Sequence, residues 1–148
     1  MLKKLDRLSA FQKLVLYILL DLLCLGAGMG VPFFCILLGL PVGWYGAQKL
    51  VVDPTNLNAQ LRQILRLGLV TSGLTKIGMI LIWVPALRLL FRADFDLANF
   101  GMPLVLFEPR ASFIGWIVLM VVISPFLQLL MTVFGAHLRL ILERKSLA

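Results

Sequence analysis

Charge is what this sequence has least of. Only 14% of its 148 residues are charged and 61% are apolar, and the mean hydropathy is +1.00. A soluble domain carries about 45–50% apolar and about 25% charged residues, so the composition excludes that class. It also excludes a disordered chain, which needs low hydrophobicity. Since a membrane-spanning helix needs about 20 apolar residues, we expect residues 1–148 to form a single transmembrane helical bundle.

Histidine and cysteine are also scarce, which argues against metal and redox chemistry. The chain has one histidine, His137, and two cysteines, Cys24 and Cys35, that lie in apolar runs and form no C-x-x-C pair. A metal site needs several ligands, so we expect no metal and no cofactor. Asp94 and Asp96 resemble the start of a calcium loop, but Val105 stands where an EF-hand needs glutamate.

Long uncharged stretches define the expected spans. Residues 22–48 and 111–138 have no charged side chain, and glycines at 26, 28 and 30 followed by Pro32 predict a turn inside the first stretch. The sequence thus predicts an all-α integral membrane protein with an N-terminal helical hairpin and four transmembrane helices, at about 12–27, 31–49, 67–91 and 112–137. Asp53 and Pro54 predict the start of a short interfacial helix at about 54–66. The alternative is three spans, with residues 14–48 as one helix.

The basic residues set the expected orientation. With four spans, the side that holds both termini and the 49–66 segment carries ten basic and three acidic residues, whereas the charges of the other side sum to zero. The positive-inside rule then places both termini in the cytoplasm, in a membrane of the bacterial inner-membrane type. The net charge of +7 therefore reflects topology, and we expect no nucleic-acid partner. A cleavable signal peptide is the other interpretation of the N-terminus, but Asp21 interrupts its apolar region.

Two charged residues, Asp21 and Lys76, fall near the middle of the predicted spans. At 1.5 Å per residue, Asp21 lies roughly 10 Å and Lys76 roughly 13 Å from the same membrane surface. Each costs about 2.5–3.5 kcal/mol on insertion scales when unpaired. We therefore expect an intramembrane charge pair between Asp21 and Lys76. The alternatives are Lys76 extending to the cytoplasmic surface while Asp21 is protonated or bonded to hydroxyls, and an ion or proton pathway.

Small and polar residues repeat at helical spacing. Two small-residue stripes predict close helix packing, within the chain or between chains; they are Gly39, Gly43 and Ala47, and Gly68, Ser72 and Gly73. The last span carries a polar stripe of Ser124, Gln128 and Thr132, which should face protein because lipid cannot satisfy an amide.

No catalytic motif accompanies these features. Ser72 and Lys76 could form a serine–lysine dyad by spacing, but no oxyanion donor accompanies them, so we expect no enzyme. The sequence favours a non-catalytic accessory or assembly subunit that packs, in the lipid bilayer, against other membrane proteins. The alternative is a small transporter or channel that acts as a homo-oligomer and uses Asp21, Lys76 and the polar stripe.

Overall fold

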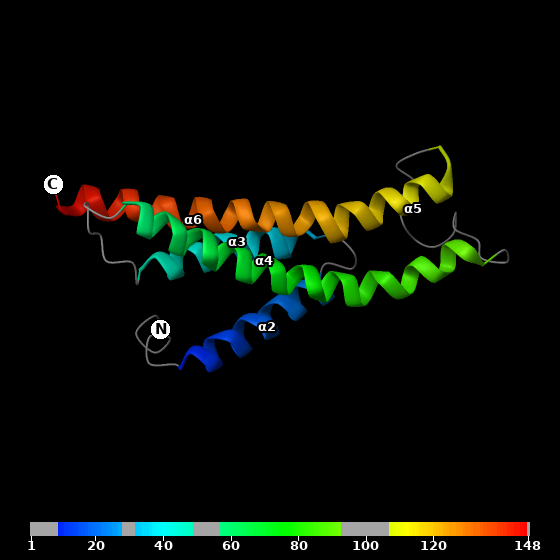
Figure 1. The fold of residues 1–148 in the computed structure, drawn as a ribbon, viewed down its shortest axis with the longest axis horizontal. Helices are drawn as coiled ribbons and strands as arrows, with labels where there is room; N and C mark the ends of the chain where they lie inside the picture. Colours follow the sequence, from blue (N-terminus) through cyan, green and yellow to red (C-terminus); the bar gives the residue numbers. More distant parts are fainter. Residues whose placement is uncertain (1–8, 28–31, 49–56, 93–106, 148) are drawn as a thin grey trace.

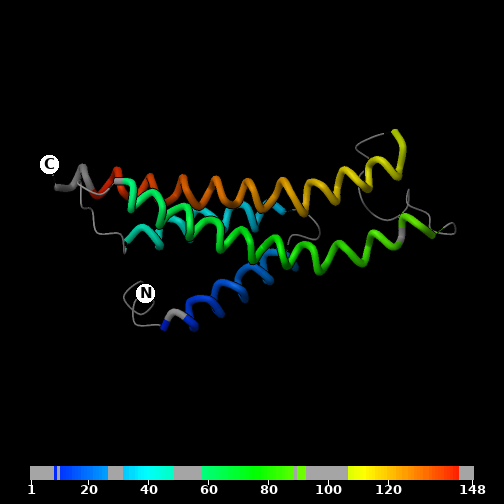
Figure 2. Tube along the Cα trace, viewed as in Figure 1, coloured from blue at the N-terminus to red at the C-terminus, as the bar shows by residue number. Residues whose placement is uncertain are grey.

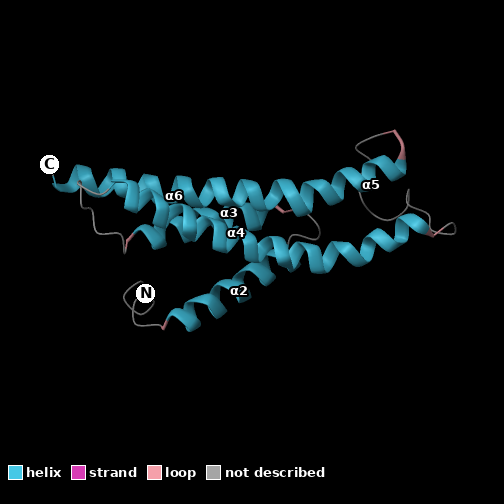
Figure 3. Cartoon of the chain, viewed as in Figure 1, coloured by secondary structure: helices cyan, strands magenta, loops and turns pink. Residues whose placement is uncertain are grey.

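The computed structural model of the protein describes residues 9–27, 32–48, 57–92 and 107–147. Within these ranges 94% of the residues are helical and no strand occurs (Figure 3). The predicted all-α class is confirmed. The predicted hairpin turn at 28–31, the Asp53–Pro54 helix start, the N-terminal residues 1–8 and most of the loop at 92–111 lie outside the described residues.

Six helical segments and one 3-10 turn make up the described chain. They are α2 (Ala10–Ala27), α3 (Phe33–Ala47), α4 (Leu57–Leu87), the 3-10 turn η2 (Arg88–Phe91), α5 (Pro109–Val118), the π-helical turn η4 (Leu119–Ile123) and α6 (Ser124–Leu147). A reciprocal capping pair starts α2. The backbone N–H of Gln12 donates to Ser9 Oγ (3.2 Å), and the backbone N–H of Ser9 donates to Gln12 Oε1 (2.9 Å).

Two helices are long and apolar enough to cross a membrane, Asn58–Leu87 and Pro109–Glu143. The first corrects the sequence prediction, because the interfacial helix at 54–66 and the span at 67–91 form one unbroken helix from Leu57 to Leu87. Ile64 explains the difference: it is 2% exposed and packs with Ala47 and Ala136. Its side of the helix faces the bundle rather than the lipid headgroups.

The hairpin formed by α2 and α3 covers only part of the length of the other helices. In Figures 1 and 2, α4 runs beside the helix formed by α5, η4 and α6, in the opposite direction, whereas α2 and α3 lie along one end of that pair. At 1.5 Å per residue, α2 is about 27 Å and α3 about 22 Å long. The hydrocarbon core of a bilayer is about 30 Å thick, so both helices are shorter than a full crossing.

The closest helix contact joins α3 to α6 through glycines. A Cβ added to Gly39 would lie 2.5 Å from the Gln128 carbonyl oxygen, and one added to Gly43 would overlap the Thr132 carbonyl. A Cβ added to Gly135 of α6 would likewise overlap the Leu40 carbonyl of α3. The first small-residue stripe therefore lies against α6 within the same chain, and the two backbones touch directly.

Apolar clusters lie at two levels of the bundle. One contains Ala47, Ile64 and Ala136. The other contains Cys35, Met79, Trp83 and Met120. The buried polar residues of α2 and α6, and Thr71, Ser72 and Thr75 of α4, come between these two levels.

The glycine contact gives a first prediction. Gly43→Ala should lower the free energy of unfolding by about 1–3 kcal/mol, because the new methyl group must push two backbones apart. The matched control is Gly73→Ala, since Gly73 has nothing within 4 Å of an added Cβ. Unfolding in mixed micelles with increasing dodecyl sulfate measures both variants. Equal stabilities of the two variants would contradict the close contact.

Candidate functional site

The hydroxyl group of Tyr17 lies at the meeting point of α2, α4 and α6. It donates to the Thr71 carbonyl of α4 (2.9 Å), lies 2.9 Å from Thr75 Oγ1 and accepts from Nε2 of Gln128 on α6 (3.0 Å). Tyr17 is 8% exposed and Gln128 is fully buried. One oxygen atom thus connects three helices inside an apolar bundle.

Asp21 extends this network by one step. Its Oδ2 accepts a hydrogen bond from Thr75 Oγ1 (2.8 Å), whereas its Oδ1 is buried without a hydrogen-bond partner. Asp21 is 5% exposed and Thr75 is 0% exposed. A single hydroxyl donor is a poor substitute for the hydration shell of a carboxylate, so the group must hold its proton or gain another partner at Oδ1.

The predicted ion pair between Asp21 and Lys76 is not formed. Lys76 is exposed on the outer surface of α4, and the hydrogen bond to Asp21 comes from its neighbour, Thr75. Successive residues of an α-helix point about 100° apart. Because Thr75 faces α2, the next side chain is directed away from α2.

The polar stripe of α6 is completely buried. Ser124, Gln128 and Thr132 each have 0% exposure. Gln128 reaches Tyr17, and Thr132 Oγ1 donates to the Gln128 carbonyl of its own helix (2.9 Å). Ser124 Oγ and Gln128 Oε1 have no hydrogen-bond partner. The stripe thus faces protein, and part of its hydrogen-bonding capacity is unused.

We use the name polar cluster for the buried residues of this layer. Its members are Tyr17, Asp21, Thr71, Thr75, Ser124, Gln128 and Thr132. The sequence analysis missed Tyr17, Thr71 and Thr75. The available signal was spacing: Tyr17 is four residues before Asp21, and Thr71 is four residues before Thr75, so each pair shares one helix face.

The second small-residue stripe is divided between two environments. A Cβ added to Gly68 would lie 2.7 Å from Leu129 Cδ1 of α6, whereas one added to Gly73 would meet nothing within 4 Å. Ser72 Oγ donates to the Leu69 carbonyl of its own helix (3.4 Å). Gly68 therefore contacts α6, and the Ser72 hydroxyl bonds to its own helix rather than to Lys76.

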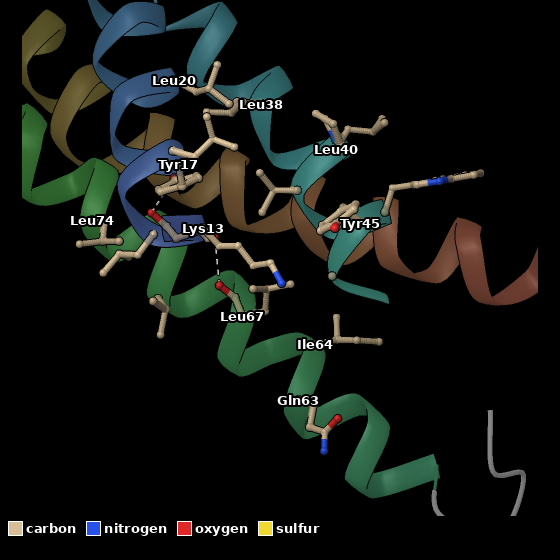
Figure 4. Close-up of a pocket in the computed structure, with 18 residues that line it drawn as sticks. Lys13, Tyr17, Leu20, Leu38, Leu40, Tyr45, Gln63, Ile64, Leu67 and Leu74 are labelled. Carbon is tan, nitrogen blue, oxygen red and sulfur yellow. Dashed lines mark hydrogen bonds between the residues drawn. The ribbon is translucent and has the colours of Figure 1, made fainter. Parts of the chain in front are cut away.

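An apolar groove of about 810 Å³ lies between α2, α3 and α4, and residues of all three helices line it. Figure 4 shows that Leu20, Leu38 and Leu74 line it, and that Lys13, Tyr45 and Gln63 lie toward one end. Tyr17 and Thr71 also line the groove. The groove thus borders two residues of the polar cluster.

The hydroxyl groups can accommodate two protonation states of Asp21. When Asp21 is ionised, Thr75 donates to it and Tyr17 donates to the Thr71 carbonyl. When Asp21 is protonated, it can donate to Thr75 Oγ1, whose own hydrogen then turns to the Thr71 carbonyl at 3.3 Å. When a proton is added to or removed from Asp21, only the hydroxyl hydrogens have to turn, so the cluster can accommodate either state without moving a heavy atom.

Comparison with known proteins adds no relative: no family model, no curated protein and no solved structure matches this chain significantly. Among the described residues, no group of three or more histidine, cysteine, aspartate or glutamate side chains could hold a metal ion. The polar cluster and the groove are therefore the structural features that bear on function.

The cluster gives a second prediction, in the form of two double-mutant cycles. Asp21→Leu combined with Thr75→Val should show a coupling energy of about 0.6–1.7 kcal/mol, which lies between the average and the maximum for hydrogen bonds between membrane helices. Asp21→Asn combined with Lys76→Met should show coupling near zero, because Lys76 points away from Asp21. The measurement is the free energy of unfolding in mixed micelles. A larger coupling energy of Asp21 with Lys76 than with Thr75 would contradict this arrangement and support an ion pair between Asp21 and Lys76.

Proposed function

We propose that this chain is an integral protein of a bacterial inner-membrane type of bilayer, with four membrane helices formed by α2, α3, α4 and the α5–α6 helix. Basic side chains at one end of the bundle support this topology: Arg62 and Arg66 near the start of α4 and Arg139 near the end of α6. The N-terminal end of α2 lies at the same end of the bundle (Figure 1). The positive-inside rule makes this the cytoplasmic end, so both termini are cytoplasmic.

Cysteine accessibility tests this topology. In a background with Cys24→Ala and Cys35→Ala, Ser9→Cys and Glu143→Cys should react with a charged maleimide in inside-out vesicles, and Phe107→Cys in right-side-out cells. These three positions are solvent-facing or partly exposed and lie near helix ends. Reaction of Ser9→Cys and Glu143→Cys from opposite sides would refute the four-helix arrangement.

We further propose that the protein is a non-catalytic accessory or assembly subunit that binds another membrane protein. The observation that carries this proposal is the incomplete packing of α2. Among the described side chains of α2, Tyr17 and Asp21 are buried, whereas Leu14 (40%) and Leu20 (42%), which line the groove, remain exposed. The groove beside α2 is within the size range of binding pockets, about 300–1,000 Å³.

The proposed occupant of the groove is a transmembrane helix of the partner. Its apolar side chains would lie against Leu38 and Leu74, and an acidic residue near its cytoplasmic end would complement the basic end of the groove at Lys13. Helix association in a membrane depends on shape and on a few polar contacts rather than on a hydrophobic effect between helices. A groove with one polar end suits that mode of binding.

Photocrosslinking in native membranes tests this docking. A benzophenone amino acid at Val70, which lines the groove, should give an adduct with a second protein. The matched control is Ile77, which has similar exposure (56%, against 51% for Val70) and does not line the groove. A protein adduct confined to Val70 supports the proposal. Lipid adducts alone at both positions would count against it.

The second candidate is a small transporter or channel that acts as a homo-oligomer. The unpartnered polar atoms of Asp21, Ser124 and Gln128 favour this candidate, since intramembrane ionisable groups commonly mark ion pathways. Lys76, on the outer surface of α4, could contribute to a contact between copies. The mass of the purified protein in detergent separates the candidates: a stable homo-oligomer favours transport, and a stoichiometric complex with a different subunit favours the accessory role.

A further inference from the structure

Among the side chains that the structure describes, three buried polar atoms lack a hydrogen-bond partner. They are Asp21 Oδ1, Ser124 Oγ and Gln128 Oε1, on side chains that are 5%, 0% and 0% exposed. Leaving one buried polar atom unsatisfied costs about 1–3 kcal/mol. Three such atoms in one layer of a small bundle indicate a bound species that would satisfy them.

The helix register brings these atoms to neighbouring levels. Gln128 is hydrogen-bonded to Tyr17, which sets the two residues at one level of α6 and α2. Asp21 is one turn after Tyr17, and Ser124 is one turn before Gln128. Because α2 and α6 run in opposite directions (Figure 1), both steps lead the same way along the bundle. Asp21 and Ser124 therefore share the next level, about 5.4 Å further on.

The regular α-helical backbone is interrupted near this level. Pro125 directly follows Ser124 and is preceded by the π-helical turn Leu119–Ile123. Proline has no N–H, so a carbonyl about one turn earlier loses its helical donor. π-Helical turns occur frequently at functional sites. The irregular backbone thus lies beside the unpartnered hydroxyl group of Ser124.

We propose that Asp21, Ser124 and Gln128 bind a small monovalent cation inside the bundle, either sodium or a proton carried as hydronium. A carboxylate, an amide oxygen and a hydroxyl are hard oxygen ligands, which suit hard cations. A single carboxylate balances one positive charge, which favours a monovalent over a divalent ion. The site uses the same atoms that favour the transporter candidate, and a partner helix in the groove would close its route from that side.

Few other charged groups face the site. On α2, Tyr17 and Cys24 are its titratable neighbours, and Cys35 is the neighbour on α3. Lys76 of α4 faces outward, and the segment of α5, η4 and α6 from residue 111 to residue 136 has no charged residue. The carboxyl group of Asp21 therefore has no permanent cation beside it, which leaves its charge to be balanced by a bound one.

The groove offers a route to this site. It reaches Tyr17 and Thr71, and the hydrogen bonds from Tyr17 to Thr75 and from Thr75 to Asp21 connect it to the carboxyl group. A proton can pass along these hydroxyls by rotation of their hydrogens. Sodium would need the helices to separate locally beside α2, which has few contacts with α4.

Labelling with dicyclohexylcarbodiimide tests the proposal on the full-length protein in detergent. This reagent modifies protonated carboxyl groups in apolar surroundings, and mass spectrometry locates the adduct. We expect labelling at Asp21 and loss of labelling in Asp21→Asn. If the bound cation is sodium, sodium should protect Asp21; if it is a proton, labelling should be fastest at low pH. The labelling rate is measured across pH, with sodium chloride compared against choline chloride at equal ionic strength.

The results separate the two cations. Saturable protection by sodium but not choline identifies sodium. A rate that falls with rising pH and is indifferent to sodium identifies the proton. Ser124→Ala and Gln128→Leu should each weaken sodium protection about 10–100-fold, or move the pH midpoint by about one unit, whereas Ser72→Ala should change neither. Circular dichroism confirms that each variant is folded.

The proposal fails if Asp21 is not labelled under any condition, since a cation then has no route to it. It also fails if labelling is unchanged by pH and sodium, or if folded Ser124→Ala and Gln128→Leu both behave like the unmodified protein. In those cases the oxygens hold water or remain unsatisfied.

Discussion

The hydroxyl group of Tyr17 decides how α2 is attached to the rest of the protein. It bonds to Thr71 and Thr75 of α4 and to Gln128 of α6, whereas most of the apolar surface of α2 stays exposed. In an apolar bilayer a lost hydrogen bond is not replaced by water. The orientation of α2 therefore depends on a polar contact, while the position of α3 depends on the glycine contact with α6.

Sequence patterns located the features that depend on spacing along one helix. The Gly39–Gly43 stripe and the buried face of α6 follow from residues three or four positions apart, and the interior position of Asp21 follows from its distance along the helix. The partner of Asp21 could not be found in this way. Thr75 and Lys76 differ by one position, and depth alone cannot distinguish them. The rotation of α4 selects Thr75, and that rotation is set by packing against α2 and α6.

The boundaries of α4 illustrate a second limit. A change from mixed to apolar composition near residue 67 suggested two elements, an interfacial helix and a span. The structure has one helix because Ile64 is needed against Ala47 and Ala136. The composition of a segment indicates the surroundings of a helix. Whether the helix continues depends instead on its backbone, and no proline or glycine interrupts residues 57–67.

The unequal lengths of the helices have a consequence for the surrounding lipid. The side formed by α2 and α3 presents about 22–27 Å of helix, whereas α4 and the α5–α6 helix extend well beyond it (Figure 1). A bilayer adapts to a short hydrophobic length by thinning locally, at a cost of fractions of a kcal/mol per ångström. The protein would then be surrounded by a membrane of uneven thickness. Covering the short side with a neighbour removes that elastic deformation, so bilayer mechanics alone would draw another membrane helix to the side where the groove lies.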